Sequence, residues 1–293
     1  MELITIKSEN IIARIVPEYG GNLCKVTAYG YDVIDFSEEW LENKIYTGTP
    51  VLYPTPNIAE NASFIWEGKQ IVLCKNGKMY DCHGVVHDEK WNYEKINESV
   101  VNVWLDFKKG TELYNSFPFE HRISIKYTAL NTGISVEYKI SNFGDEKIPF
   151  GFGIHPYFQK LCSDISFKIS SNNIMESVSE DCLIPTGKLT QISSFERELR
   201  DFTGGTVFTS LNHESTFEIF YKEIGLKVKS STSKDFDFIV LYHPFDEAFF
   251  CIENQTTAVN AHNLSETGIV SGLQVCDKES QGQVKLLFEM SAP

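Results

Sequence analysis

The sequence is poor in arginine and in positive charge generally. Four arginines occur among 293 residues, and 26 lysines and arginines face 40 acidic residues, which gives a formal net charge of −14. An acidic surface repels both the phosphates of nucleic acids and anionic lipid headgroups. We therefore expect no nucleic-acid partner and no attachment to a membrane surface.

Long apolar runs are also missing. No stretch of 18 apolar residues occurs, so a membrane-spanning helix is not expected. The N-terminus has no basic segment followed by an apolar core, which argues against a signal peptide. The seven cysteines are scattered and none forms a CxxC pair, so we expect reduced thiols and a cytoplasmic location.

Common cofactor and metal motifs are absent as well. The sequence holds no GxxxxGKS/T loop, no GxGxxG between a strand and a helix, no HExxH and no GxSxG. His83 and His87 lie four residues apart, close to Asp88 and Glu89, so a zinc site is conceivable. Spacing indicates no third ligand, and a surface histidine beside acidic residues explains His87 equally well. We predict neither a metal nor a cofactor.

The remaining composition is that of a globular protein. Apolar residues make up 42% of the chain and charged residues 23%, which argues against disorder. A compact domain of this length buries roughly 75% of its unfolded surface, so its core needs no disulfide or metal. No repeat, proline-rich linker or shift in composition divides the chain. Residues 1–293 are therefore predicted to form one domain.

Apolar and polar residues alternate with a period of two along much of the chain, which is typical of strands with one buried face. The alternating apolar residues are Val101, Val103, Leu105 and Phe107; Ile123, Ile125 and Tyr127; Ile134, Val136, Tyr138 and Ile140; Phe217, Ile219 and Tyr221; and Val284, Leu286, Phe288 and Met290. Residues 131–133 are predicted to close a hairpin. Helical periodicity is scarce, and its best candidate runs from Ser37, a possible cap, to Asn43. The pattern predicts an all-β fold, a large twisted β-sandwich.

Two ionisable residues lie in apolar surroundings. His155 ends the run Pro149–Ile154 and is followed by a proline and two aromatic residues. Its charge changes near neutral pH, so it can act as acid or base, although a core histidine bonded to the backbone is an alternative. Glu253 follows the apolar run Phe249–Ile252. A carboxylate there is either paired, hydrogen-bonded or used in chemistry, or it turns to solvent at a strand end.

Around these residues the chain resembles the aldose 1-epimerase (mutarotase) family. Four segments match in the expected order: Pro50–Asn57 followed by Phe64 and Gly68; His83-Gly84 with Trp91; Gly151–Phe158; and Cys251–Thr256 running on to Asn260–Leu264. The resemblance implies the galactose mutarotase-like fold, in which a sugar cleft crosses a concave sheet. It covers nearly the whole chain and agrees with the strand pattern.

The resemblance also implies an activity and a set of site residues. The protein would interconvert the α and β anomers of a free aldohexose, with His155 as the general acid and Glu253 as the general base. Such a mechanism needs Glu253 ionised and His155 charged. The candidate substrate-binding residues are His83, Asn57, Tyr157, His87 and Asn212. Asn212 stands where the family has a sugar-binding aspartate, and Ile58 where it usually has an arginine that contacts the sugar.

The replacement of that arginine keeps other functions open. One alternative is a carbohydrate-binding or sensor protein that retained the fold without catalysis. Another is a hexose-6-phosphate 1-epimerase, although phosphate recognition needs cationic or backbone N–H donors. Glycoside hydrolysis is a weaker alternative, because it needs a second carboxylate facing Glu253. The expected partner is a monosaccharide, and the chain is expected to be a monomer or a homodimer.

Overall fold

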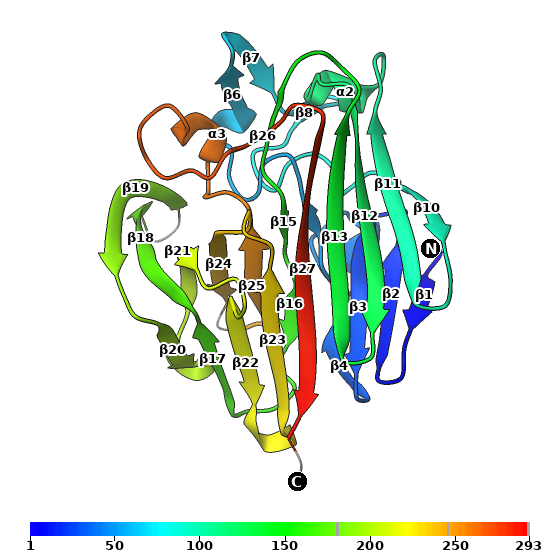
Figure 1. The fold of residues 1–293 in the computed structure, drawn as a ribbon, viewed down its shortest axis with the longest axis vertical. Helices are drawn as coiled ribbons and strands as arrows, with labels where there is room; N and C mark the ends of the chain where they lie inside the picture. The colour runs from blue at the N-terminus through cyan, green and yellow to red at the C-terminus, as the bar shows by residue number, and fades with distance from the viewer. Residues whose placement is uncertain (180–181, 245, 292–293) are drawn as a thin grey trace.

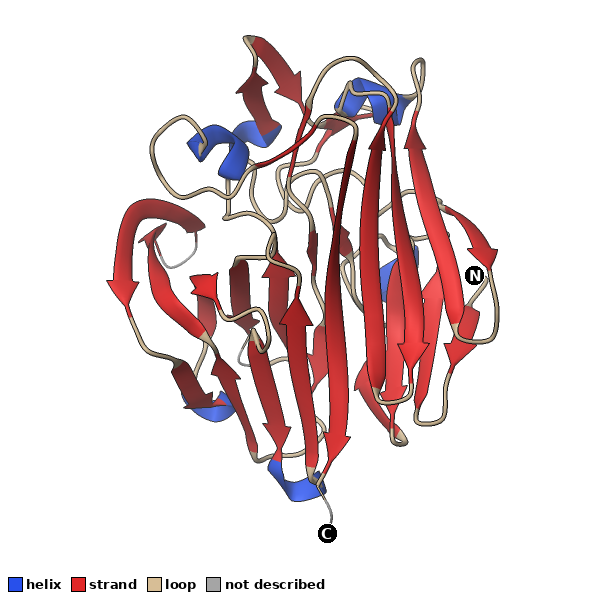
Figure 2. Ribbon diagram, viewed as in Figure 1, coloured by secondary structure: helices blue, strands red, loops and turns tan. Residues whose placement is uncertain are grey.

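The computed structural model describes residues 1–179, 182–244 and 246–291. Two large antiparallel sheets pack face to face, and short helices and small hairpins gather around their edges (Figures 1 and 2). The all-β prediction is confirmed. Within the described ranges, none of the helices has the length and hydropathy needed to span a bilayer.

The larger sheet has twelve strands. In spatial order they are β1 (Ile4–Lys7), β2 (Ile11–Val16), β3 (Asn22–Ala28), β4 (Tyr31–Ile34), β16 (Tyr157–Gln159), β25 (Phe249–Gln255), β24 (Phe238–His243), β21 (Gly204–Leu211), β18 (Ser171–Ser179) and β19 (Cys182–Gln191), with β15 (Gly153–Ile154) pairing with both β25 and β5 (Val51–Leu52). Strands from both halves of the chain therefore meet at β16, β15 and β25, near the middle of this sheet.

The second sheet has nine strands. They are β10 (Asn92–Lys95), β11 (Val100–Phe107), β12 (His121–Leu130), β13 (Gly133–Asn142), β27 (Glu279–Met290), β23 (Leu226–Thr232), β22 (Phe217–Tyr221), β17 (Ile165–Ile169) and β20 (Phe195–Glu198). Three small two-stranded sheets are formed by β6 (Ser63–Trp66) with β7 (Lys69–Val72), β8 (Cys74–Lys75) with β9 (Lys78–Met79), and β14 (Ile148–Phe150) with β26 (Gln274–Cys276). The helices are α1 (Glu38–Glu42), α2 (Glu112–Ser116) and α3 (Ala261–Leu264), with 3₁₀ turns at Glu60–Ala62, Leu199–Asp201 and Lys222–Ile224.

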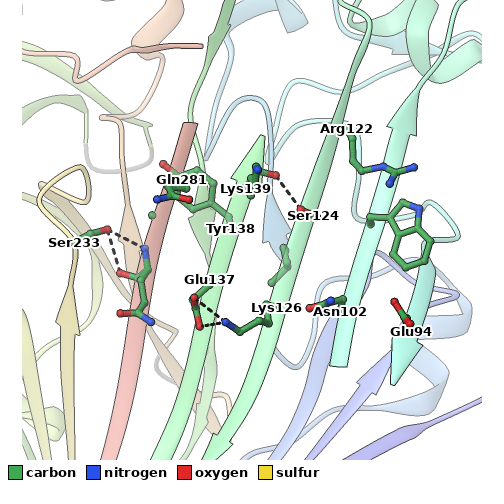
Figure 3. Close-up of a pocket in the computed structure, with 14 residues that line it drawn as sticks. Glu94, Asn102, Arg122, Ser124, Lys126, Glu137, Tyr138, Lys139, Ser233 and Gln281 are labelled. Atoms are coloured by element: carbon green, nitrogen blue, oxygen red, sulfur yellow. Dashed lines mark hydrogen bonds and ion pairs between the residues drawn. The ribbon is translucent and has the colours of Figure 1, made fainter. Parts of the chain in front are cut away.

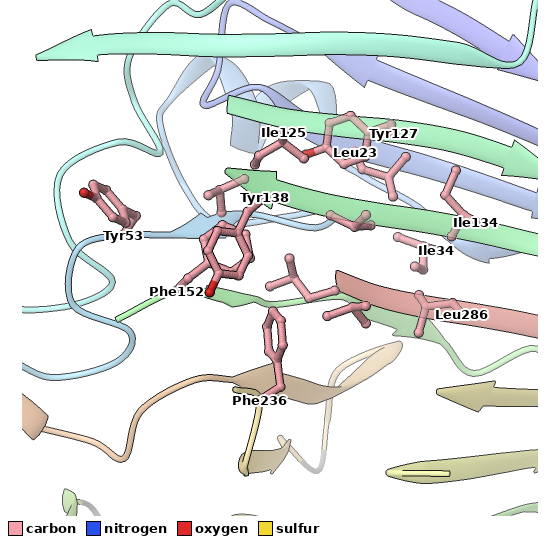
Figure 4. Close-up of a cluster of buried hydrophobic side chains, with 14 of the residues drawn as sticks. Leu23, Ile34, Tyr53, Ile125, Tyr127, Ile134, Tyr138, Phe152, Phe236 and Leu286 are labelled. Atoms are coloured by element: carbon pink, nitrogen blue, oxygen red, sulfur yellow. The ribbon is translucent and has the colours of Figure 1, made fainter. Parts of the chain in front are cut away.

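The hydrophobic core fills the space between the two sheets. Its main cluster includes buried residues from Ile4 to Phe288, so both ends of the chain contribute to it. In Figure 4 the ring of Tyr138 lies beside Phe152, with ring centroids 4.3 Å apart, and Phe236 follows next to them. Burial of apolar surface is the main driving force for such a core. That all 293 residues form one domain stays a prediction.

The predicted alternation appears in all five segments, with two local differences. Met290 is 38% exposed, because it is the last residue of β27, beyond the covered part of the sheet. The hairpin loop is shorter than predicted, since Gly133 already pairs with Leu130. The predicted helix forms as α1, and the Ser37 hydroxyl caps it by accepting a hydrogen bond from the backbone N–H of Trp40.

Helices α2 and α3 were not predicted. Each has at most five residues, which is too short for a helical period to appear in the sequence. Thr111 caps α2 as Ser37 caps α1, by accepting a hydrogen bond from Tyr114 N–H. Each buries apolar side chains, Leu113 in α2 and Ala261 and Leu264 in α3.

Candidate functional site

The structure brings His155 and Glu253 together near the middle of the twelve-stranded sheet. His155 directly follows β15, and β15 pairs with β25, the strand that carries Glu253. The distance from His155 Nε2 to Glu253 Oε1 is 3.3 Å. The two residues are 5% and 1% exposed. We refer to these two side chains as the His155–Glu253 pair.

Two glycines allow the segments of the site to pack this closely. Gly84 has a φ of +73°, and a Cβ at this position would lie 2.1 Å from the carbonyl oxygen of Tyr53. A Cβ on Gly151 would lie 2.5 Å from both Pro56 Cδ and Thr257 Oγ1. Any larger side chain at either glycine would therefore push the site segments apart.

Among the described residues, the hydrogen-bond donors to Glu253 are neutral amide groups. Its Oε2 accepts hydrogen bonds from Gln255 Nε2 at 2.8 Å and from Asn57 Nδ2 at 3.4 Å, while Oε1 faces His155. Amide groups orient the carboxyl group but do not supply a compensating charge. Gln255 was not among the predicted site residues. Its position two residues after Glu253 on one strand was a usable signal, because such residues share a face.

Burial sets the protonation of the pair. Burial raises the pKa of Glu253 to about 8, although the hydrogen bonds from Gln255 and Asn57 act in the opposite direction. Burial also lowers the pKa of His155 to about 4. At neutral pH the closed site therefore favours a protonated carboxyl group beside a neutral imidazole. The expectation of an ionised Glu253 and a charged His155 concerns the site with a sugar bound and stays a prediction.

His83 lies beside the pair in a defined tautomer. The backbone N–H of Asn57 donates to the ring atom His83 Nδ1 at 3.2 Å, and the backbone N–H of His83 donates to the backbone carbonyl of Asn57 at 2.8 Å. Because Nδ1 accepts a hydrogen bond, we infer that the neutral ring carries its proton on Nε2. The His83 and His155 rings meet edge to face with centroids 5.2 Å apart. His83 can therefore offer one N–H donor next to the pair.

His87 lies in a second layer, behind a tyrosine that the sequence analysis did not identify. The Tyr46 ring is 4.8 Å from the His83 ring and 4.4 Å from the His87 ring. The Tyr46 hydroxyl donates to the carbonyl of Cys82 at 3.1 Å. Tyr46 therefore covers the histidine side of the site, and no periodic pattern in the sequence marks it.

Tyr157 covers the other side of His155. The two rings stack with centroids 4.8 Å apart and planes 20° apart. Tyr157 belongs to β16 and is itself mostly buried. The structure thus brings together five predicted site residues, His155, Glu253, His83, Asn57 and Tyr157.

Several buried polar atoms around the pair have no hydrogen-bond partner. In the described part of the chain these include His155 Nδ1, Gln255 Oε1, Thr55 Oγ1 and Thr257 Oγ1. Buried polar atoms are normally satisfied, and clusters of unsatisfied ones need an explanation such as a ligand or water. The unused hydrogen-bonding capacity of this region is what a polar ligand would satisfy.

Two other predicted positions lie in different surroundings. Asn212 is exposed in a turn after β21, where its Oδ1 accepts from Glu214 N–H and its own N–H donates to Ser170. None of these bonds joins it to the pair, so we leave it out of the proposed site. Ile58 packs against an apolar cluster that includes Val240, the strand partner of Glu253. A sugar-binding role for Asn212 thus stays a prediction, for which its local hydrogen bonds offer no support.

Among the described residues, no group of three or more His, Cys, Asp and Glu side chains is placed to hold a metal ion. His83 Nδ1 is already engaged with Asn57, and His87 lies beyond Tyr46. The zinc alternative for these two histidines therefore gains no geometric support.

A hollow of about 800 Å³ lies elsewhere, on the nine-stranded sheet (Figure 3). Its side chains largely pair with one another. Lys126 lies 3.0 Å from Glu137, and the backbone of Gln283 bonds to Ser233. This surface contains no residue of the His155–Glu253 pair, and its open, self-paired side chains are typical of a solvated sheet face.

The fold matches solved structures over almost its entire length. A galactose mutarotase-like protein from Clostridium acetobutylicum is 21% identical, with a TM-score of 0.84 over 99% of this chain and 95% of that chain. The protein Slr1438 from Synechocystis sp. PCC 6803 is 19% identical, with a TM-score of 0.83 over 99% of this chain and 96% of that chain. The fold is therefore that of the galactose mutarotase-like proteins.

Sequence comparison identifies the family. A family profile described as aldose 1-epimerase matches residues 2–271. Two curated relatives match over shorter stretches of the chain. The uncharacterized Escherichia coli K12 protein YphB is 27% identical over 109 residues, which are 36% of this chain and 35% of that protein. The uncharacterized YihR is 26% identical over 130 residues, which are 42% of this chain and 41% of that protein. These two matches thus span less than half of either relative. The chain belongs to the aldose 1-epimerase family.

Proposed function

We propose that the protein is a mutarotase that interconverts the α and β anomers of a free aldohexose. The observation that supports this most directly is the contact between a buried imidazole and a buried carboxyl group, 3.3 Å apart, in a chain of this family. One acid and one base are sufficient to open and close a hemiacetal ring. In this proposal Glu253 is the base and His155 is the acid.

The ring-opening step moves two protons. Glu253 takes the proton from the C1 hydroxyl, and the electron pair of that O–H bond forms the C1 carbonyl. The C1–O5 bond breaks, and its electron pair goes to the ring oxygen, which receives the proton of His155 Nε2. Rotation about the C1–C2 bond and reversal of both transfers then close the ring on the opposite face.

The protonation that burial favours fits one stage of this cycle. After ring opening, Glu253 carries the proton and His155 is neutral, which is the arrangement that burial favours. Before opening, the pair must hold the same proton on His155 instead. Sugar hydroxyl groups that donate to the carboxylate would stabilise its ionised form and so shift the proton to the imidazole. The pair needs no net gain or loss of protons.

The surrounding residues have binding and positioning roles in this proposal. His83 Nε2–H would donate to a sugar hydroxyl, and Asn57 and Gln255 would hold the carboxylate in place. The pair is nearly closed to solvent, so a sugar reaches it only when covering side chains such as Tyr46 and Tyr157 shift. Exclusion of water strengthens the electrostatic contacts once the sugar is bound.

Polarimetry on freshly dissolved α-D-glucose and α-D-galactose tests the proposal. We expect Glu253→Gln to lower the rate of anomer exchange by about 10³-fold, within the range that one proton transfer contributes. Glu279→Gln, which changes an exposed carboxylate on the other sheet, should leave the rate unchanged. A wild-type rate in Glu253→Gln, with the fold confirmed by circular dichroism, would remove Glu253 from the mechanism.

A non-catalytic sugar-binding protein is the second candidate. It is favoured by the closed site and by Ile58, whose alkyl side chain supplies none of the hydrogen bonds an arginine would. Calorimetry would then detect saturable binding of glucose or galactose without any faster loss of optical rotation. A hexose-6-phosphate 1-epimerase ranks lower, because Ile58 provides no charge for a phosphate.

A further inference from the structure

A row of aromatic rings leads from His155 toward the surface. Tyr157 stacks on His155, and the Phe249 ring lies 4.6 Å from the Tyr157 ring. Trp40, in α1, meets Phe249 edge to face with centroids 6.2 Å apart. The last two rings are partly exposed. The row therefore connects the buried acid of the proposed mechanism with the outside of the molecule.

Strand register places this row on the same sheet face as the catalytic carboxyl group. Phe249, Cys251 and Glu253 alternate along β25 and so share one face. Tyr157 pairs with Cys251, and Gln159 pairs with Phe249 on the neighbouring strand. At the usual rise per residue, Phe249 lies about 13 Å along the strand from Glu253. The aromatic row is therefore an extension of the site.

A cavity of about 240 Å³ opens along this row. Trp40, Tyr157 and Phe249 line it together with the polar side chains of Gln159 and Glu247. Its described lining residues include no lysine, arginine or histidine, so it is unsuited to a phosphate. Aromatic faces beside amide and carboxylate groups suit a neutral ring that has an apolar face and hydroxyl groups at its edge. A sugar ring has this chemistry.

We propose that this cavity is a subsite for a second sugar, and that the preferred substrate is a reducing disaccharide. The reducing ring would lie at the His155–Glu253 pair, and the second ring would lie against Trp40 and Phe249. The bonds that break and form are those of the monosaccharide reaction, so the second ring contributes binding only. This inference rests on the proposed function for its catalytic part.

The test compares sugars that share a glucose unit at the reducing end. Values of kcat/KM are measured by polarimetry for glucose, maltose, cellobiose and lactose. We expect at least one disaccharide to exceed glucose by about tenfold, because contacts remote from the reacting bond raise kcat/KM. Trp40→Ala should remove this advantage and leave the glucose value unchanged. Trp40→Phe, which retains an aromatic ring, should preserve most of it.

The possible failures are distinguishable. The subsite is rejected, while the proposed function stands, if glucose reacts and no disaccharide has a higher kcat/KM. The same holds if Trp40→Ala lowers kcat/KM equally for all four sugars. If no sugar reacts, the proposed function fails, and calorimetry then decides the subsite alone. Disaccharide binding about tenfold tighter than glucose binding, lost in Trp40→Ala but not in Trp40→Phe, supports the subsite. Equal or absent binding rejects it. Thermal unfolding of both variants checks that the fold is retained.

Discussion

Two buried polar clusters in this molecule have opposite electrostatic character. The first, which we call the Lys75 cluster, comprises Lys75, Tyr80, Asp88 and Glu89. Lys75 Nζ lies 2.6 Å from carboxylate oxygens of both Asp88 and Glu89, and Tyr80 donates to Asp88 at 2.7 Å. The second is the His155–Glu253 pair, whose carboxyl group accepts hydrogen bonds from two amide side chains in the described part of the chain. Both clusters flank the segment that carries His83.

The pKa values express the difference. Burial alone would raise the pKa of Asp88, but hydrogen bonds from Lys75 and Tyr80 lower it to about 2. The hydrogen bonds that the amide groups of Gln255 and Asn57 donate to Glu253 do not outweigh the effect of burial, so the pKa of Glu253 rises to about 8. A carboxylate with a full positive partner keeps its charge and serves the structure. A carboxyl group that lacks such a partner can change protonation near neutral pH, which acid–base chemistry requires.

The largest expected effect is on catalysis at the pair. His155→Gln removes the proposed acid while keeping a polar side chain of similar size. We expect kcat for anomer exchange to fall by about 10²–10⁴-fold, the usual contribution of one proton transfer. His213→Gln is the matched control, because His213 lies in a turn and bonds to Thr232. Equal polarimetric rates in both variants would place His155 outside the reaction.

The next effect is on stability at the Lys75 cluster. Lys75→Met leaves two carboxylates without their buried cation, and we expect a loss of about 3–5 kcal/mol in the free energy of unfolding. Lys139→Met, which removes an exposed partner of Glu279, should cost less than about 1 kcal/mol. Urea unfolding measures both values. If Lys75→Met were as mild as Lys139→Met, the contrast between the two clusters would not hold.

The smallest effect is on the pH dependence of stability. The folded pKa of Glu253, about 8, lies above the ordinary glutamate value of 4.5, so the folded chain binds the extra proton between these pH values. The contribution of Glu253 to stability is therefore present below pH 4.5 and is lost as the pH rises through about 8. Asp88 adds nothing in this window, since its contribution is lost only as the pH falls from 3.8 toward about 2.

Thermal unfolding between pH 7 and 9 measures this dependence, because burial lowers the pKa values of His155, His121 and His262, which therefore stay neutral over this range. The decline in melting temperature of the wild-type chain with rising pH should be smaller in Glu253→Gln, because the substituted amide does not titrate. An identical decline in both chains would show that Glu253 is already ionised at neutral pH. The proposed resting protonation of the pair would then be wrong.

Much of the fold could be predicted from local pattern, and the site only in part. The alternation of Val101, Val103, Leu105 and Phe107 identified a strand because a buried sheet face requires that period. The meeting of His155 with Glu253 followed only from a resemblance, since no local rule links residues so far apart. The cover over the site and the protonation of the pair depend on packing between distant segments, such as Tyr46 against His83. Local sequence patterns carry no direct signal for such contacts.

The close approach of Gly84 to the Tyr53 carbonyl also limits how this site can evolve. A methyl group at position 84 would overlap the backbone itself, so no rearrangement of neighbouring side chains can compensate for it. Exposed positions on the nine-stranded sheet are under no such restriction. In a library of random variants selected for anomer exchange, we expect almost every active variant to keep Gly84. Exposed positions of the nine-stranded sheet should accumulate substitutions freely.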